Sequence, residues 1–218
     1  GPSYTTGATR AADHGARFRA VFSNRAGSLA SAAATLTVLT RATPLAQALP
    51  QADNLPATNA VVAAASAGRF VAAWIVADPV TRGPTGIRTS RYTRAGGWSA
   101  AVDVPTVDID ASRGLTAALG NDGTAVVTWV QPAAGQPSAW FVRQAPGGGW
   151  SSPALIENDD SVAVRGVKVV ADANGTATAV WNTSAARTFA SRLDAGSTAW
   201  SGPVELGLPN GGSLMPVL

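Results

Sequence analysis

The feature of this 218-residue sequence that most constrains its fold is a repeat marked by paired tryptophans. Three segments begin with Gly and reach a Trp six residues later, and a Trp-Ser pair follows each of them. The marker residues are Gly68, Trp74 and Trp98 in the first copy, Gly123, Trp129 and Trp150 in the second, and Gly175, Trp181 and Trp200 in the third. Such self-similarity is typical of proteins in which one structural unit packs against copies of itself.

The spacing between the markers shows which part of the unit varies. The second Trp and the next Gly are 25 residues apart in both cases, from Trp98 to Gly123 and from Trp150 to Gly175. The two Trp of one copy are separated by 24, 21 and 19 residues in chain order. The segment between the two Trp of one copy therefore varies in length, whereas the segment from the second Trp to the next Gly does not. This is expected when insertions gather in a loop between packed strands.

Each copy is predicted to contain four short β-strands. A Val-rich strand leads to a turn, where Asn-Gly and Asp-Gly steps accept the positive φ that a hairpin requires. The second strand runs from the Gly to the first Trp, and the fourth starts at Trp-Ser. The predicted first strands are 60–66, 115–119 and 167–171, and the predicted third strands are 87–93, 139–144 and 188–193. Four short, repeated strands are typical of propeller blades, and the Trp residues are expected to pack between neighbouring blades.

The pattern Asp/Asn-Gly-x-Ala-x-x-x-Trp, followed by Trp-Ser-x-Pro, resembles the blades of secreted bacterial β-propeller proteins over residues 58–206. It is also similar to the Asp-box of sialidases, but the leading Ser of that motif is missing. The resemblance implies an extracellular or cell-surface setting. Because closed propellers have about four to eight blades, three copies imply a fragment or a ring that another chain completes.

Residues 1–38 have a different character. Alternation over 18–23 predicts a half-buried strand, and 24–28 is a predicted turn before a second strand. Asp13-x-Gly15 and Phe18 resemble the last strands of a Cys-free bacterial immunoglobulin-like domain, with Phe18 where that family has its corner Tyr. The match implies half a sandwich, which its own missing strands or another chain would complete.

The predicted fold class is therefore all-β, a partial immunoglobulin-like sandwich followed by three four-stranded propeller-like blades. The predicted segments are immunoglobulin-like strands at 1–38, a Pro-punctuated linker at 39–57, blades at 58–104, 105–156 and 157–206, and the beginning of a further blade at 207–218.

The amino-acid composition excludes several classes of function. The sequence has no Cys, which excludes a disulfide scaffold, thiol chemistry and Cys-bound zinc. It contains no run of 18 apolar residues, so no membrane-spanning helix is predicted. A formal net charge of +3 provides no basic patch for nucleic acid. We expect no cofactor and no metal site.

Few residues offer catalytic chemistry, and we expect no catalytic residue. His14 is predicted to be an exposed turn residue. Glu157 and Glu205 are the only two Glu, and we interpret them as solvated blade-edge residues rather than a glycosidase pair. The acidic clusters at 108–110 and 157–160 are interpreted as polar loops, with calcium binding as the alternative.

Two aromatic or basic groups remain as candidate binding residues. Arg88, Arg91, Arg94 and Tyr92 are interpreted as a solvated edge rather than a nucleic-acid strip. Trp140 breaks the repeat, and with Phe141 it is the candidate ligand-binding pair, core packing being the alternative.

The predicted function is a non-catalytic structural or adhesive module of a secreted or cell-surface bacterial protein, including filament formation. Its expected partners are protein segments that complete the sandwich and the propeller. One alternative is a carbohydrate-binding, lectin-like propeller, with a glycan as partner. Another is part of a glycoside-hydrolase-like propeller whose active residues lie outside this fragment.

Overall fold

The computed structural model describes Thr5 and residues 7–38, 53–106, 113–133, 135–159 and 161–207. The chain divides into two compact units, Gly1–Gln47 and Ala48–Leu218. Strands form both units, and the described ranges contain no α-helix, so the predicted all-β class is confirmed. Most of the predicted linker and of the segment 207–218 lies outside the described residues.

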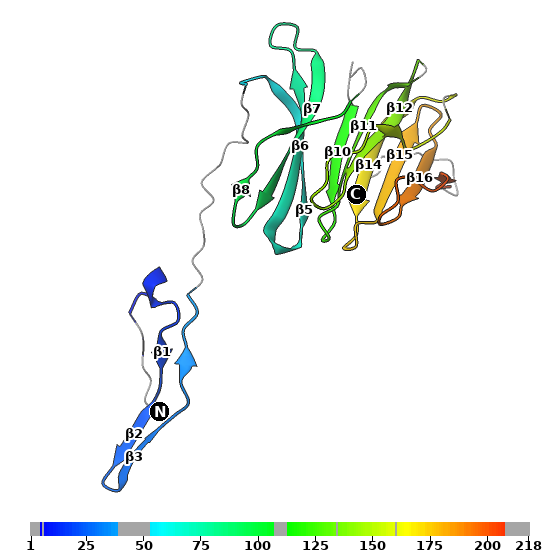
Figure 1. Cartoon of the computed structure of the whole chain (residues 1–218). Helices are drawn as coiled ribbons and strands as arrows, with labels where there is room; N and C mark the ends of the chain where they lie inside the picture. The colour runs from blue at the N-terminus through cyan, green and yellow to red at the C-terminus, as the bar shows by residue number, and fades with distance from the viewer. Residues whose placement is uncertain are drawn as a thin grey trace. The chain divides into compact units, whose positions relative to one another are not determined.

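The first unit is a β-hairpin built from two short ladders (blue in Figure 1). Its strands are β1 (Arg17–Phe18), which pairs with β4 (Ala34–Thr35), and β2 (Val21–Asn24), which pairs with β3 (Gly27–Ala30). The predicted turn is present at the end of β2, where the Asn24 side-chain carbonyl accepts a hydrogen bond from Ala26 N at 2.8 Å.

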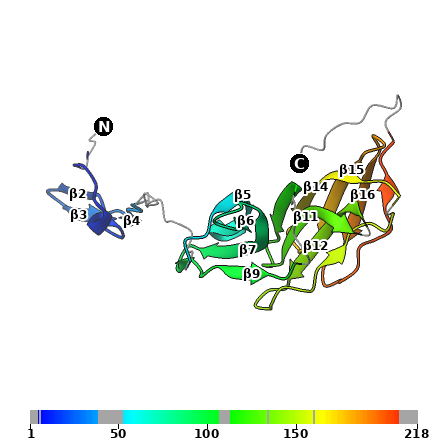
Figure 2. The ribbon, with the colours of Figure 1, turned by 90° about the horizontal axis from the view of Figure 1, so that it is seen from above.

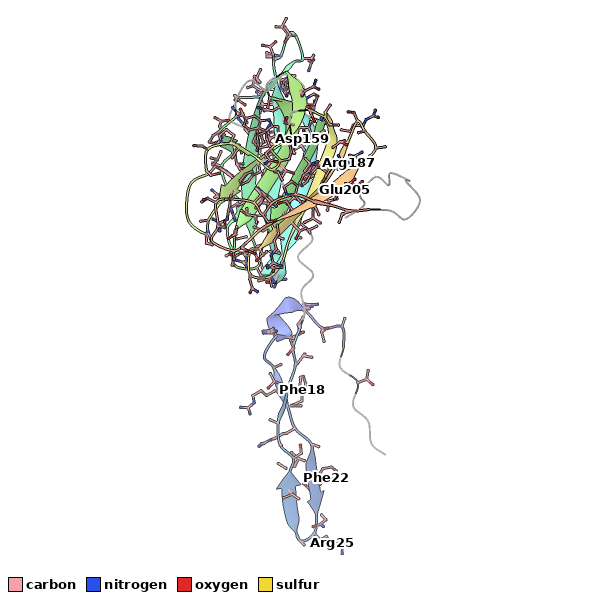
Figure 3. The ribbon with its side chains drawn as sticks, turned by 90° about the vertical axis from the view of Figure 1, so that its right-hand side faces the viewer. Phe18, Phe22, Arg25, Asp159, Arg187 and Glu205 are labelled. Carbon is pink, nitrogen blue, oxygen red and sulfur yellow. The ribbon has the colours of Figure 1, made fainter. Side chains whose placement is uncertain are left out.

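The hairpin lacks the half-buried strand that the alternation predicted. Phe18 and Phe22 are 41% and 61% exposed, and the strand is interrupted at Arg19 and Ala20. A half-buried strand needs a second layer to cover one of its faces, and the described part of this unit has only one layer. Figure 3 shows the two Phe along the hairpin and Arg25 at its tip.

The second unit contains three antiparallel sheets, which we number in chain order (Figure 1). Sheet 1 consists of β5 (Ala57–Ala65), β6 (Arg69–Ala77), β7 (Pro84–Thr93), β8 (Gly97–Trp98) and β9 (Val102–Val104). Sheet 2 consists of β10 (Arg113–Leu119), β11 (Ala125–Ala133), β12 (Gln136–Gln144) and β13 (Ala154–Leu155). Sheet 3 consists of β14 (Val164–Ala171), β15 (Ala177–Thr183), β16 (Thr188–Leu193) and β17 (Val204–Glu205). Each copy of the sequence repeat thus forms one meander.

The turn between the first two strands explains why each copy carries a Gly. Gly68, Gly123 and Gly175 have φ values of +67°, +97° and +83°, a region that other residues rarely adopt. In sheet 1 the turn is a short 3₁₀ segment, Ser66–Gly68, rather than the Asp-Gly and Asn-Gly turns of the second and third copies.

The sequence predicted a fourth strand that starts at Trp-Ser, whereas the outermost strand is broken there in sheets 1 and 2. In sheet 1, β8 and β9 both pair with β7, and in sheet 2 a single bridge between Trp150 and Gln144 precedes β13. The Ser of the Trp-Ser pair lies at this point in each sheet. Its N–H donates to the carbonyl of an Arg on the third strand, and its Oγ accepts from the N–H of the same Arg. The pairs are Ser99 with Arg91 (2.7 and 3.1 Å), Ser151 with Arg143 (2.8 and 3.0 Å) and Ser201 with Arg192 (2.7 and 2.9 Å).

The three sheets stack face to face, with the cores between them (Figure 2). Successive residues of a strand point to opposite faces, so one strand contributes to two cores. On β11, Val127 and Trp129 pack with Ala73 of sheet 1, whereas Val126 packs with Trp181 of sheet 3. The described sheets form an open stack, and no closed propeller is present among them.

Candidate functional site

The second Trp of the second and third copies contacts the preceding sheet, whereas Trp98 of the first copy packs on Tyr92 of its own sheet. Trp150 Nε1 donates to Thr89 Oγ1 on β7 at 3.1 Å. The Trp200 ring packs edge-to-face on Phe141 of β12, with the ring centroids 5.4 Å apart. Thr89 and Phe141 occupy equivalent positions, two residues before the Arg that bonds the Trp-Ser serine. In these two copies the repeated Trp is therefore a contact between neighbouring sheets.

Trp140 and Phe141 lie on opposite faces of sheet 2. Trp140 is half-buried, pairs across the strands with Trp129 and packs into the core that faces sheet 1. Phe141 is buried and faces sheet 3. The two rings do not form one aromatic surface, and the contacts of both fit the core-packing alternative. A ligand role for either residue stays a prediction.

A cavity of about 230 Å³ opens between sheet 3 and the connection that leads to it from sheet 2. It lies beside the start of β14 and the end of β15. Its lining combines apolar and polar side chains, which are Val162, Val164, Trp181, Phe189 and Pro203 on the apolar side and Glu157, Asn158, Asp159, Thr183 and Arg187 on the polar side.

Two residues that line this cavity are smaller than their counterparts in sheet 2. Gln131 and Trp140 of sheet 2 occupy the repeat positions that Thr183 and Phe189 occupy in sheet 3. Gln131 is long enough for its Oε1 to accept a hydrogen bond from Trp129 Nε1 at 2.6 Å. Sequence reasoning missed the cavity, although a comparison of the repeats position by position contains this signal.

Arg187 lies at the cavity wall and pairs with Glu205. Its Nε and Nη2 donate to the two carboxylate oxygens of Glu205 at 2.7 and 2.6 Å, and its guanidinium lies 4.8 Å from the centre of the Phe189 ring. The hydrogen bonds from Arg187 lower the pKa of Glu205 below its usual range. Phe189 also stacks on Trp181, and the two rings form the aromatic part of the wall. Figure 3 marks Arg187, Glu205 and Asp159.

The structure corrects the prediction for Glu157. It is only 6% exposed, not solvated, and its Oε2 accepts a hydrogen bond from Asp159 N at 2.8 Å. Asp159 in turn accepts hydrogen bonds from the Ser161 hydroxyl and N–H, which lower the pKa of Asp159. Glu205 is exposed and is not part of the cavity lining. Of the two Glu, Glu157 alone lines the cavity.

The solvated-edge interpretation is also wrong for Arg88 and Arg91. Arg88 is largely covered and pairs with Asp53 and Asp103 at 2.6 and 2.7 Å. Arg91 crosses from sheet 1 to sheet 2, where it donates to Gln144 Oε1 at 2.7 Å and to the Gly123 carbonyl at 3.0 Å. Burial, with a contribution from Arg69, lowers the pKa of Arg91. Both Arg stabilise the sheets.

The remaining candidates do not form a site. His14 is exposed, and its Nδ1 accepts a hydrogen bond from Val38 N at 3.2 Å. Of the acidic clusters, 108–110 and Asp160 lie outside the described residues. Elsewhere, in the described ranges, no group of three or more His, Cys, Asp or Glu is arranged to hold a metal ion. Within those ranges, too, no helix is long and apolar enough to span a bilayer.

Comparison with known proteins finds several similar solved structures, and two of them illustrate the match. No protein family and no curated protein matches the sequence. A protein of unknown function from Dyadobacter fermentans is 13% identical, with a TM-score of 0.48, over 66% of this chain and 49% of its own. A glycosyl hydrolase from Bacteroides ovatus is 14% identical, with a TM-score of 0.45, over 72% of this chain and 51% of its own. The chain thus spans about half the length of each, and neither similarity assigns it a function.

Proposed function

We propose that this chain is a non-catalytic structural or adhesive module of a secreted or cell-surface bacterial protein. In this proposal the three sheets are propeller-like blades that follow the last strands of an immunoglobulin-like domain. The supporting observation is the use of the repeat's marker residues. Trp150 and Trp200 join neighbouring sheets, and Ser99, Ser151 and Ser201 hold the outer strands. Stacked repeats present extended surfaces that suit adhesion.

Labelling of intact cells of the source bacterium tests the setting. An antibody against this chain is expected to label intact cells or the culture medium, and protease added to intact cells is expected to remove the cell-bound label. Label that appears only after lysis would contradict the proposal. For the adhesive role, beads coated with the chain should bind to source cells, whereas beads coated with the heat-denatured chain should not.

A carbohydrate-binding function is the second candidate, and the cavity beside sheet 3 favours it. Asn158, Asp159 and Arg187 provide the donors and acceptors that sugar hydroxyls need, beside apolar wall residues. A second hollow of about 360 Å³ shares Glu157, Asn158 and Pro203 with the cavity and adds Trp200. The two hollows adjoin, so together they offer room for more than one sugar unit.

A glycan array separates the two candidates. If the cavity binds sugar, the chain retains a glycan, Asp159→Asn weakens that binding at least tenfold, and Asp194→Asn leaves it unchanged. Asp194 is a suitable control because it is an exposed carboxylate whose described partner is Arg192, away from the cavity. Loss of binding in Trp140→Ala but not in Asp159→Asn would place the glycan at Trp140 instead. No binding to any glycan would leave the structural role as the only proposal.

A further inference from the structure

We infer that a second copy of this chain docks on the end of the sheet stack, so that sheet 3 of one molecule packs on sheet 1 of the next. The inference rests on the proposed structural role and deepens it, because it names the partner as another copy of this chain. It follows from the way in which sheets 1, 2 and 3 pack on one another.

Each sheet uses two different faces for its two neighbours. Trp129 and Trp181, the first Trp of their copies, lie on the face that meets the preceding sheet. Thr89 and Phe141 lie on the face that meets the following sheet. Among the described strands, no sheet precedes sheet 1 and none follows sheet 3. The two ends of the stack therefore carry the two complementary halves of one repeated contact.

Each end face exposes an apolar side chain at a position that is buried inside the stack. On the end face of sheet 1 the chain's own Leu55, Trp98 and Ala101 cover Trp74, and the exposed part lies beside them. Val62 and Val169 are equivalent, because each pairs with the residue two places before the first Trp. Val169 faces sheet 2 and is 5% exposed, whereas Val62 has no preceding sheet and is 65% exposed.

The opposite end shows the same contrast. Ala118 of sheet 2 and Val170 of sheet 3 are equivalent, because each pairs with the residue three places before the first Trp. Ala118 faces sheet 3 and is 3% exposed, whereas Val170 is 42% exposed. Burying these side chains against a further sheet removes apolar surface from water, which favours association.

The repeat also predicts which residues meet in the docked pair. Trp98 corresponds to Trp150 and Trp200, and Ala190 corresponds to the residues that those two Trp contact. Trp98 of one copy should therefore pack on Ala190 of the other. Likewise, Arg192 corresponds to Arg91, which bonds the turn of the following sheet. In the single chain Arg192 pairs with its neighbour Asp194 and is exposed.

Lys168 lies on the docking face of sheet 3, at the repeat position of the buried Thr116. Its long aliphatic stem can cover apolar surface while the ammonium group reaches the rim of the contact. The contact is heterologous, since different faces of the two copies meet, and it produces a closed ring or a growing filament. Two copies of three sheets fall within the about four to eight blades of closed propellers.

Site-specific cross-linking tests the contact. Because the sequence contains no Cys, only the introduced Cys can react. The full-length variants Trp98→Cys and Ala190→Cys are treated with a short bis-maleimide, separately and as a mixture. The expected result is a product of twice the chain mass in the mixture and single chains in each variant alone. No such product in the mixture, or equal yields in the separate variants, would overturn the inference.

Sedimentation provides the second measurement. The mass of the unmodified chain is expected to rise with concentration, and Val62→Asp should reduce the association constant at least tenfold. Val80→Asp is the matched control, because Val80 is exposed on the connection between β6 and β7 and not on an end face. A folded chain that stays monomeric at all concentrations would contradict the inference. The cell-surface and bead experiments are independent of this outcome, so failure here is distinguishable from failure of the proposed function.

Discussion

At the scale of single residues, Gly175 shows how closely the sheets approach each other. Its φ of +83° disfavours any side chain, and a Cβ at this position would overlap the carboxylate of Asp122 in the turn of sheet 2. Gly175 is therefore required by the backbone conformation and by the packing of two turns.

The variant Gly175→Ala should be destabilised by about 2–4 kcal/mol, from backbone strain plus the overlap. Gly196→Ala is the control, because Gly196 has a similar φ of +78° and no atom within 4 Å of the added Cβ. It should lose only the strain of about 1–2 kcal/mol. Urea unfolding measures both, and equal losses would show that the turns do not touch.

Thr89 offers a test of the contact between sheets 1 and 2. Its hydroxyl accepts from Trp150 Nε1, so Thr89→Val leaves a partly buried N–H without this partner. We expect a loss of about 1–3 kcal/mol in the free energy of unfolding, and a much smaller loss for Thr89→Ser. Thermal unfolding of the unmodified chain and the two variants measures these losses. A Val variant as stable as the Ser variant would contradict the hydrogen bond.

The Arg187–Glu205 pair predicts a pH dependence. Because Arg187 lowers the pKa of Glu205 in the folded chain, the pair stabilises the fold at pH values above the ordinary Glu value of 4.5. That stabilisation is lost as the pH falls through the lowered pKa. The stability difference between the unmodified chain and Glu205→Gln should therefore shrink on acidification, as measured by urea unfolding across that range. A difference independent of pH would contradict the pair.

At the scale of elements, the sequence predicts strands better than it predicts their interruptions. The third strand of sheet 3 is predicted at 188–193 and is found there. The prediction succeeds because residues that favour strands lie between turn-forming residues. The break in the outer strand was not predictable, since it depends on Ser99, Ser151 and Ser201 bonding a neighbouring strand. The alternation at Phe18 and Phe22 wrongly predicted a half-buried strand, because sequence periodicity does not show whether a second layer is present to cover one face.

The outer-strand serine can be tested by substitution. Ser151→Ala removes the acceptor for Arg143 N and should cost about 1 kcal/mol, with faster hydrogen exchange at the Arg143 amide. Ser152→Ala, one residue further along, is the control, because only the carbonyl of Ser152 is used. Unchanged exchange at Arg143 in the Ser151 variant would refute the role assigned to the serine.

At the scale of the whole second unit, the stack follows from the sequence and the cavity does not. The regular Gly and Trp markers predict equivalent units with Trp between them, and Trp129 and Trp181 lie between sheets. The cavity depends on where two copies differ, at Thr183 and Phe189, and on how the connection with the buried Glu157 runs past them. Such differences become visible only when the sheets are placed side by side.

The central claim is that the paired Trp join successive sheets by the same contact. The most direct measurement is cross-linking of engineered Cys pairs with a short bis-maleimide, after circular dichroism has shown that the variants are folded. We expect Thr89→Cys with Trp150→Cys, and Phe141→Cys with Trp200→Cys, to form cross-links within one chain, and the mismatched pair Thr89→Cys with Trp200→Cys to form none. Failure of both matched pairs, or equal reaction of the mismatched pair, would contradict the stack.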